Sequence, residues 1–447
     1  MTTKILLIGQ AEIDITPSSY KIAMIGHNPI RFEGLNDRLY AQATVFSQER
    51  TTVCVISADL VGYSLEFTRD VQERIARRLG IPRENIVLCA THTHRGPDMY
   101  WPHPRKNNIA YIETLKKKFV KIAENANANL APAAVGAGAG RASIGINRRL
   151  PVDGQVAFLP NPKGAYDREL WVVKIIRGNQ LTGLLLSHGC HPSGQKPLLI
   201  SADYPGHVRA LLKKKYGPHV RFSYLLGCCG DVRPNGPLRG QKWTLPTKKQ
   251  VREMAASVIQ TVKKIKEEKN AQLKFLHSSL QLPFDRNRIP LSELEKRHGE
   301  LVTQIKNEKI TDKDPAKHYI LRYAQAYANA IRLKKGRQNP KPAVFDLALL
   351  RIGRIIFVFL PGEVFTEIGM QIKKLQRNQA IIPVTMYNEL CTYICTARAC
   401  REGGYESNVD FVWYAGKFPF PFSPACEKII VNKVNVLLKR INQHGAV

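Results

Sequence analysis

Two histidines with a single residue between them, His92 and His94, are the residues whose type and spacing most directly suggest chemistry. They follow the apolar stretch 85–89, which has the length and β-branched content of a buried strand, so they lie where that strand ends. Alternate side chains of an extended backbone point to the same face, which lets the two imidazoles converge on one point. Because neutral imidazole is a favoured zinc ligand, the pair predicts a zinc site. The alternative for an isolated pair is hydrogen bonding near the surface.

Two more residues with ligand chemistry also stand at the ends of predicted strands. His191 follows the apolar stretch 181–186, and Glu363 follows the apolar stretch 355–360. Loops at the carboxyl ends of strands are favoured places for sites in α/β proteins. On local sequence alone, the favoured interpretation of Glu363 is a residue near a helix N-terminus that interacts with the helix dipole.

The elements that must position these residues follow from apolar periodicity, which alternates between that of strands and that of helices. Strands are predicted at 4–16, 43–46, 52–57, 85–89, 171–176, 181–186, 221–226, 273–282, 345–352, 355–360 and 381–386, and helices at 67–79, 111–123, 204–216, 251–265, 367–375 and 424–441. The order strand, helix, strand over 52–89 is a βαβ unit. We therefore predict an α/β fold with a central mixed β-sheet flanked by helices, in one domain over residues 1–447. The charged helical stretch 291–338 is predicted to be an insertion, either a lid or plain scaffold.

The charge of the chain predicts attraction to anionic partners. The formal net charge is +31, which favours acidic substrates, nucleic acid or peripheral contact with anionic membranes. The basic clusters 116–118 and 213–215 lie inside helical patterns, where a solvated helix face explains them. There is no zinc-finger spacing, RNA-recognition motif or basic leucine zipper, so no specific nucleic-acid role is predicted. The sequence does not predict an oligomeric state.

The nine cysteines and the apolar stretches indicate the compartment. An odd number of cysteines, in a chain that opens without a signal-peptide pattern, is typical of reduced thiols in the cytoplasm. No Cys-x-x-Cys pair is present, so a thiolate zinc site is not expected. The longest apolar region, 344–360, is interrupted by Asp346, Arg351 and Arg354, so no transmembrane helix is predicted.

The motifs Ala-Thr-His92-Thr-His94-Arg-Gly-Pro, Cys-His191-Pro, Pro-Gly-Glu363 and Tyr393-Ile-Cys-Thr occur in this order. In this set the sequence resembles the neutral, non-lysosomal ceramidases. Asp14-Ile-Thr-Pro17, Ser57-Ala-Asp-Leu-Val-Gly62 and Gly227-Cys-Cys-Gly-Asp-Val-Arg-Pro extend the resemblance over nearly the whole chain.

The resemblance implies a zinc-dependent amidohydrolase that cleaves the N-acyl carbon–nitrogen bond of ceramide to a fatty acid and a sphingoid base. It implies that His92, His191, Glu363 and Tyr393 are the zinc ligands. It also implies that His94 lies beside the metal, where it donates to the substrate carbonyl or moves a proton, and that Tyr405 helps to hold the oxyanion. Zinc suits this reaction because it acidifies water and polarises a carbonyl, so that zinc-activated water can attack the amide.

Two departures from the family distinguish this chain. The family has a serine in its Asn-x-Ser-Pro motif, where this sequence has Arg233 in Asp-Val-Arg-Pro, and this argues against an acyl-serine route. The sequence is also expected to lack the C-terminal immunoglobulin-like domain and the secretion signal of the family. Arg233, with Arg95 or Arg148, is predicted to bind an anionic part of the substrate, because guanidinium groups match carboxylates and phosphates.

Three functions therefore stay open from the sequence. The first is hydrolysis of a lipid-like amide, for which the aromatic stretch 414–422 could line an acyl groove. The second is hydrolysis of a non-lipid amide, ester or lactone by a related zinc centre. The third is a non-catalytic relative of the fold that binds anions or membranes through its basic surface.

Overall fold

The computed structural model describes residues 4–19, 22, 32–99, 106–194, 198–236, 242–311, 317–409, 411–412 and 417–443. In this part of the chain, no helix combines the length and the apolar character that a membrane crossing requires.

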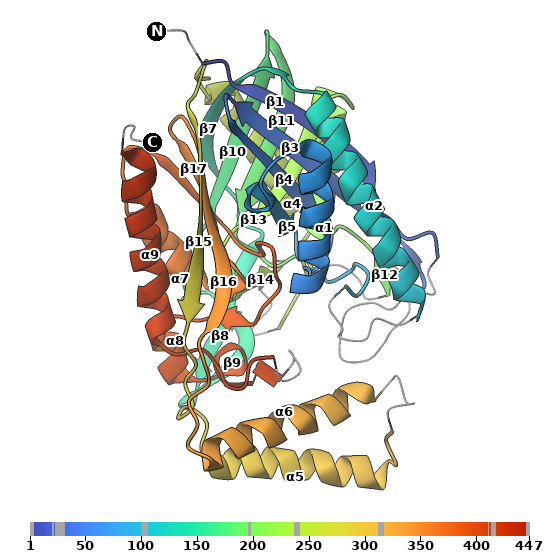
Figure 1. Ribbon diagram of the computed structural model, residues 1–447. Coiled ribbons are helices and arrows are strands. Elements are labelled where there is room, and N and C mark those ends of the chain that lie inside the picture. Colours follow the sequence, from blue (N-terminus) through green and yellow to red (C-terminus); the bar gives the residue numbers. More distant parts are fainter. Residues whose placement is uncertain are drawn as a thin grey trace.

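The first sheet has the strand order β5-β4-β3-β1-β6. Its strands are β1 (Leu7–Asp14), β3 (Tyr40–Gln48), β4 (Thr51–Ala58), β5 (Ile86–Ala90) and the short β6 (Ala131–Pro132). Helix α1 (Leu65–Leu79) joins β4 to β5, which pair in parallel, so the predicted βαβ unit is present. Helices α1 and α2 (Lys106–Ala128) lie side by side over the outer face of this sheet (Figure 1).

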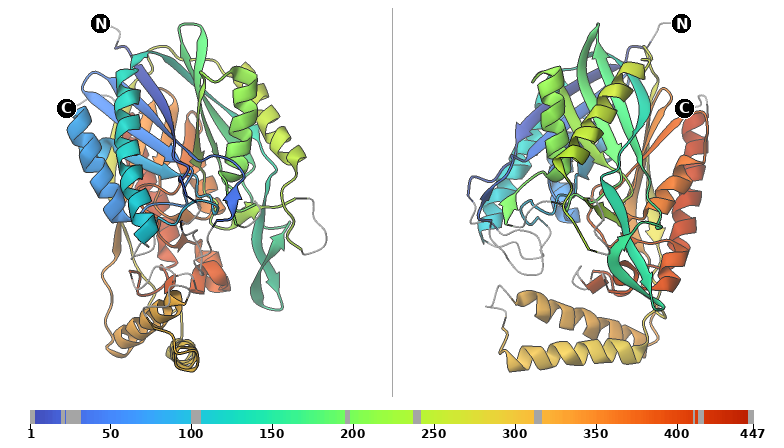
Figure 2. Two further views of the ribbon diagram at one scale, coloured as in Figure 1. Left: turned by 90° about the vertical axis from the view of Figure 1, so that its right-hand side faces the viewer. Right: turned by 180° about the vertical axis from the view of Figure 1, so that it is seen from behind.

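The second sheet has the order β13-β11-β10-β7, and the third has the order β15-β16-β17-β19. The strands of the second are β7 (Ala134–Arg141), β10 (Glu169–Arg177), β11 (Gln180–His188) and β13 (Arg221–Leu226). Those of the third are β15 (Leu273–Leu282), β16 (Ala343–Ile352), β17 (Ile355–Phe359) and β19 (Ala380–Val384). Helices α3 (Asp203–Tyr216) and α4 (Lys248–Lys264) lie outside the second sheet (Figure 2), and α7 (Thr366–Lys373) and α9 (Ala425–Asn442) lie outside the third.

The three sheets turn their inner faces toward one another. Val55 of β4, Val173 of β10 and Phe357 of β17 belong to one buried apolar cluster, which excludes water from the space between the sheets. The α/β class with mixed sheets and flanking helices is therefore confirmed, and the mixed sheet consists of separate sheets around a shared core.

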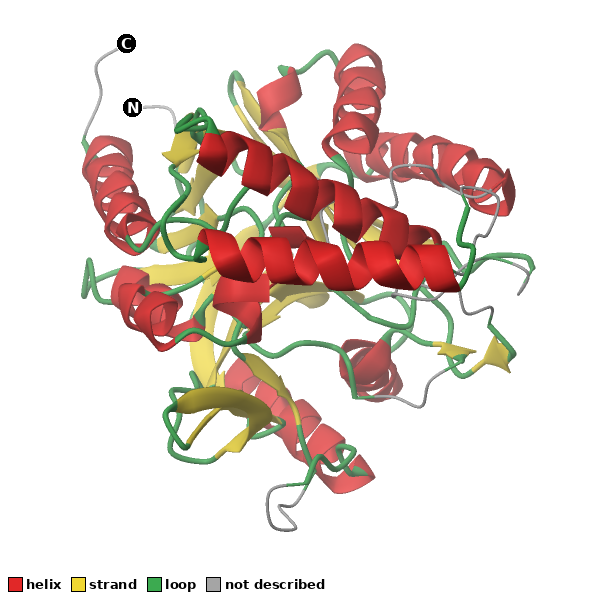
Figure 3. Ribbon diagram, turned by 90° about the horizontal axis from the view of Figure 1, so that it is seen from below, coloured by secondary structure: helices red, strands yellow, loops and turns green. Residues whose placement is uncertain are grey.

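Smaller elements lie around the lower end of the sheets. They are β2 (Gly34–Leu35), β8 (Gly145–Val152), β9 (Gln155–Asn161), β12 (Leu199–Ile200), β14 (Val232–Pro234), β18 (Glu363–Val364), β20 (Tyr393–Ile394) and α8 (Ala397–Glu402). The predicted insertion consists of α5 (Leu291–Asn307) and α6 (His318–Lys335), which lie side by side across the lower end (Figures 1 and 3).

The helical insertion rests on the aromatic stretch near the C-terminus. Leu294 and Tyr327 from the two helices share a buried cluster with Phe411 and Phe420. Phe418 and Phe422 are also buried, in the main core, whereas Tyr414 lies outside the described residues. The described phenylalanines of this stretch therefore pack the interior.

Candidate metal centre

The His-Thr-His turn brings two imidazoles together, although not by strand alternation. Strand β5 ends at Ala90, and His92 has a left-handed backbone with φ of 66°, a conformation that is uncommon for residues other than glycine. The rings of His92 and His94 have centroids 4.9 Å apart at an interplanar angle of 88°. The two imidazoles therefore converge as predicted. However, a turn brings them together, and not the extended backbone that we expected.

His191 joins this pair from the end of β11. Its ring centroid lies 5.0 Å from that of His92 and 5.7 Å from that of His94. One ring nitrogen from each of these three histidines lies within 4.8 Å of the others. The backbone N–H of His94 also donates to the carbonyl of Pro192 at 3.0 Å, so the two loops that carry the histidines are joined directly.

A short parallel strand pair supplies the carboxylate and the phenol. Strands β18 and β20 pair with Glu363 opposite Tyr393, so residues 30 positions apart in the sequence are neighbours. Glu363 Oε2 lies 2.8 Å from His191 Nε2 and 3.5 Å from His92 Nε2. The Tyr393 ring lies 6.4 Å from the His191 ring and 5.9 Å from the Tyr405 ring. Glu363 lies in this strand pair and outside helix α7, so the helix-dipole interpretation does not explain its position.

Backbone carbonyl groups fix the orientation of two of the imidazoles. His92 Nδ1 lies 2.6 Å from the carbonyl oxygen of Val61, and His191 Nδ1 lies 2.8 Å and 2.9 Å from the carbonyl oxygens of Cys229 and Val232. Since a carbonyl only accepts, both Nδ1 atoms carry hydrogen, so in the neutral imidazole each Nε2 presents a lone pair toward the Glu363 carboxylate.

This arrangement fits a cation between the imidazoles and the carboxylate. A lone pair of His191 Nε2 and a carboxylate oxygen at 2.8 Å repel each other unless a positive charge lies between them. A proton is disfavoured there, because burial and then Arg148 lower the pKa of His191 to about 4. The Nε2 atoms of His92 and His94 are buried without a hydrogen-bond partner. Nitrogen and carboxylate donors in this combination suit Zn²⁺.

The site holds His94 neutral and Glu363 ionised. Burial lowers the pKa of His94 well below its usual value, and the neighbouring His92 and His191 lower it further. Burial acts to raise the pKa of Glu363, but positive charge at His92 and His191 outweighs burial and holds this pKa well below its usual value. A cation bound by the two neutral imidazoles would place positive charge at the same point.

Arg148 faces the histidines from strand β8 and belongs to a buried charge cluster. Its Nε donates to Glu406 at 2.8 Å, and Arg149 Nη1 donates to the other oxygen of Glu406 at 2.7 Å. Arg148 Nη1 lies 3.5 Å from His191 Nε2. Glu406 was not predicted from the sequence, where the only signal for it is its place directly after Tyr405.

Strand β8 also borders a cavity that none of the candidate metal ligands lines. Asn147 and Arg149, the neighbours of Arg148 in the sequence, line this cavity of about 780 Å³. Asp231 also lines this cavity, and burial raises its pKa to about 6. The cavity is therefore distinct from the candidate metal centre.

The other two predicted substrate-binding arginines lie on different elements. Arg233 is in β14 and places its Cζ 4.4 Å from the ring of Trp243 and 5.8 Å from the ring of Phe158. Arg95 is partly buried, and burial lowers its pKa while Asp203 opposes this effect. Neither aromatic partner of Arg233 was identified from the sequence, because nothing in their spacing connects them with the histidines.

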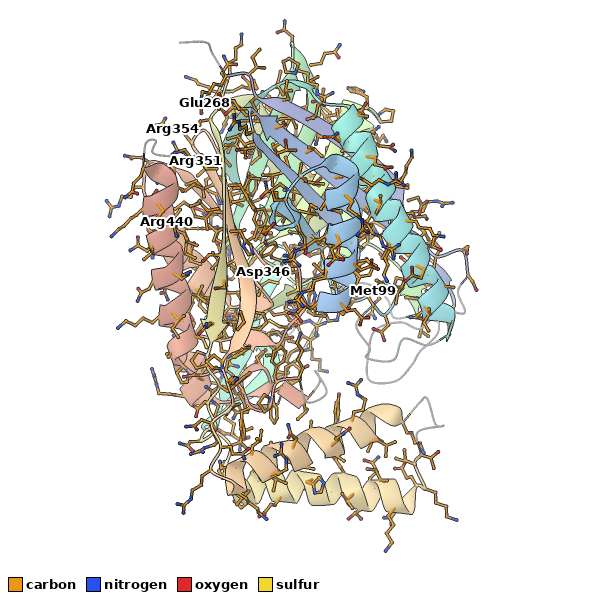
Figure 4. The ribbon with its side chains drawn as sticks, viewed as in Figure 1. Met99, Glu268, Asp346, Arg351, Arg354 and Arg440 are labelled. Carbon is orange, nitrogen blue, oxygen red and sulfur yellow. The ribbon has the colours of Figure 1, made fainter. Side chains whose placement is uncertain are left out.

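The site lies at the carboxyl ends of strands from all three large sheets. His92 follows β5, His191 follows β11, and Glu363 follows β17. Arg354 precedes β17 and therefore lies at the opposite end of that strand. Figure 4 shows Arg354 and Arg351 toward the upper end of the third sheet, so part of the basic excess lies at the end of this sheet that is opposite to the site.

Comparisons with known proteins identify the family of the chain. The family model described as neutral/alkaline non-lysosomal ceramidase, N-terminal, matches residues 6–236, which is more than half of the chain. The chain belongs to this family. The match includes His92, His94, Arg95, Arg148, His191 and Arg233 and ends before Glu363, Tyr393 and Tyr405.

Individual relatives are distant in sequence. The chain is 26% identical over 268 residues to the neutral ceramidase of Mycobacterium tuberculosis (strain ATCC 25618 / H37Rv), a match that covers 52% of this chain and 41% of that protein. The crystal structure of neutral ceramidase from Pseudomonas aeruginosa superposes with a TM-score of 0.69 at 17% identity, over 99% of this chain and 76% of that one. A structure described as ceramidase complexed with C2 has a TM-score of 0.69 at 16% identity, over 99% and 77% of the two chains. These likenesses show a shared fold.

Proposed function

We propose that this protein is a zinc-dependent hydrolase of an N-acyl amide bond. The observation that carries the proposal is the convergence of His92 Nε2 and His191 Nε2 on Glu363, with both tautomers fixed by backbone carbonyls. Membership of the neutral ceramidase family supports the reaction class. The curated relative is matched over only 41% of its length, so its activity is carried over here as part of the proposal.

The proposed ligands are His92, His191, Glu363 and Tyr393, as expected from the sequence. When bound, Zn²⁺ would supply an acidified water molecule and a polarised carbonyl, which are the two requirements for cleaving an amide. Among the described residues, the three-histidine group that could hold an ion also includes His94, so His94 stands close enough to take part in proton transfer.

His94 is proposed to move the proton. Because its pKa is low, the ring is neutral at pH 7 and can accept a proton from the attacking water. The same proton can then pass to the departing amine, which leaves as a neutral molecule. Tyr405 is proposed to donate its hydroxyl hydrogen to the oxyanion that forms at the carbonyl, which a donor fixed in place stabilises best.

We propose that the chain acts in the cytoplasm, since its nine cysteines are free and buried, as expected in a reducing compartment. Its net charge of +31 would favour peripheral contact with anionic membranes. Co-sedimentation with phosphatidylserine vesicles, compared with neutral vesicles, measures this contact.

The reaction is tested by a hydrolysis screen of purified, zinc-loaded protein. N-acyl amines including ceramide, short peptides, esters and lactones are incubated with the enzyme, and products are identified by mass spectrometry. Cleavage of an N-acyl amide that is lost in the His94→Ala variant supports the proposal. Cleavage of lactones or esters alone would instead support a zinc hydrolase of non-amide substrates. If the zinc-loaded protein cleaves none of these compounds, a non-catalytic binding function is supported.

A further inference from the structure

Two guanidinium groups lie within 6 Å of the centre of one partly exposed aromatic ring near the metal centre. Arg148 Cζ lies 5.1 Å and Arg233 Cζ lies 5.8 Å from the centroid of Phe158, whose exposed fraction is 40%. Arg233 also stacks on Trp243 at 4.4 Å, and the Trp243 and Phe158 rings have centroids 5.7 Å apart. Stacking on aromatic faces holds a guanidinium in place while its N–H groups stay free to donate.

Both guanidinium groups have donors without a partner. Arg233 forms no ion pair with any carboxylate among the described residues, and its Nε is buried without a hydrogen-bond acceptor. Arg148 is fully buried and pairs with Glu406 through Nε, yet its Nη2 has no acceptor. A buried donor of this kind costs free energy, more so when it is charged.

The two charges also act on each other. Burial and then the neighbouring Arg148 lower the pKa of Arg233 to about 10, so Arg233 stays protonated at pH 7 while it repels Arg148. An anion between the two groups would remove this repulsion and satisfy the free donors. A neutral lipid amide would leave the charge of Arg233 without a counter-charge and the free donors of both groups without a charged acceptor.

We propose that Arg148 and Arg233 bind an oxyanion of the substrate, and that the substrates are N-acyl amino acids or similar amides with an anionic group next to the scissile bond. This inference rests on the proposed function and specifies its substrate class. Arg148 Nη1 lies 3.5 Å from His191 Nε2, so the anion would lie close to the reacting carbonyl. The carboxylate of an N-acyl amino acid is two bonds from the amide nitrogen, which suits this short separation.

The reaction and the apolar contacts follow from this placement. Water adds its oxygen to the acyl carbon, the carbon–nitrogen bond breaks, and the proton that His94 accepts goes to the amine of the released amino acid. The partly exposed face of Phe158, with Trp243 beside it, would contact an apolar portion of the substrate.

The test compares N-hexanoylglycine with N-hexanoylethanolamine, which differ in having a carboxylate or a neutral hydroxyl group. For the zinc-loaded enzyme we expect kcat/KM to favour N-hexanoylglycine by about tenfold or more, since a hydrogen bond to a charged group is worth about that factor. Arg233→Met should raise KM for N-hexanoylglycine by about tenfold, with little change in kcat and no change for N-hexanoylethanolamine. Arg233→Lys should raise KM for N-hexanoylglycine by less than Arg233→Met does, because lysine keeps the positive charge but lacks the paired N–H donors of the guanidinium group.

The control is Arg252→Met, since Arg252 is exposed on α4 and should alter neither substrate. Circular dichroism shows whether each variant is folded, and Arg233→Lys keeps the test available if Arg233→Met does not fold. The anion site would be refuted if the parent enzyme had equal kcat/KM for the two substrates, or if Arg233→Met kept the preference for N-hexanoylglycine. Neither result would refute the proposed hydrolase.

Binding measured by calorimetry separates this inference from the proposed function. N-hexanoylglycine should bind the parent protein and lose affinity by about tenfold in Arg233→Met, whether or not it is hydrolysed. Binding of this kind without turnover of any amide would refute the proposed hydrolase and keep the anion site. Turnover of N-hexanoylethanolamine with no binding of N-hexanoylglycine would keep the hydrolase and refute the anion site.

Discussion

The buried cluster around Glu406 offers a quantitative test of the architecture beside the metal centre. Glu406 accepts from Arg148 at 2.8 Å and from Arg149 at 2.7 Å, and all three side chains are at most 6% exposed. The substitution Glu406→Gln keeps one acceptor oxygen but turns the other into an N–H donor, which then faces a guanidinium. Breaking a buried ion pair costs about 3–5 kcal/mol, and because one acceptor stays, we expect a loss of about 3 kcal/mol in the free energy of unfolding.

The assay is urea denaturation at pH 7, followed by tryptophan fluorescence and circular dichroism. The matched control is Glu402→Gln, since Glu402 lies 3.5 Å from Arg149 Nη2 but is 40% exposed. Because water reaches Glu402, we expect its pair with Arg149 to contribute about 0–1 kcal/mol, as pairs at a surface do, so this variant should resemble the parent protein. Equal and small losses in the two variants would show that water solvates the two guanidinium groups and would refute the buried cluster.

Two further predictions concern the surroundings of the ligands. Burial lowers the pKa of His188 to about 4 from a usual 6.5, so between these pH values the unfolded chain binds more protons than the folded one. The free energy of unfolding should therefore fall by about 3 kcal/mol as the pH drops from 6.5 to 4. Calorimetry of His188→Asn over the same pH range should show a smaller decrease. At Gly230, an added Cβ would lie 2.4 Å from the carbonyl oxygen of Glu363, so Gly230→Ala should displace the β18 backbone and weaken zinc affinity in a chelator competition. Gly299→Ala is the control, since no atom lies within 4 Å, and it should leave zinc affinity unchanged and stabilise helix α5 by about 0.5–1 kcal/mol.

The sequence predicted the elements well where apolar periodicity was regular. The strands that end before His92, His191 and Glu363 were all predicted, because each is a short, continuously apolar stretch followed by turn residues. This was enough to place ligand-type residues at the ends of strands. Periodicity does not say which sheet a strand joins, so the division into three sheets could not be predicted.

Contacts between segments that are distant in the sequence could not be predicted either. The turn at His92 needs a positive φ that nothing in the local sequence signals. The pairing of Glu363 with Tyr393 depends on a strand pair of only two residues on each side, which is too short for a periodic pattern. Arg148 was predicted to bind substrate, but its partner Glu406 is supplied by a distant segment and became visible only in the structure.

Metal analysis measures whether His92, His191, Glu363 and Tyr393 hold one zinc ion. After dialysis against Zn²⁺ and removal of free metal, inductively coupled plasma mass spectrometry should find about one zinc per chain in the parent protein, as expected for a single-ion site. His92→Ala should lose this zinc while circular dichroism shows an unchanged fold. A folded parent protein that retains no zinc, or a His92→Ala variant that retains it fully, would contradict the account.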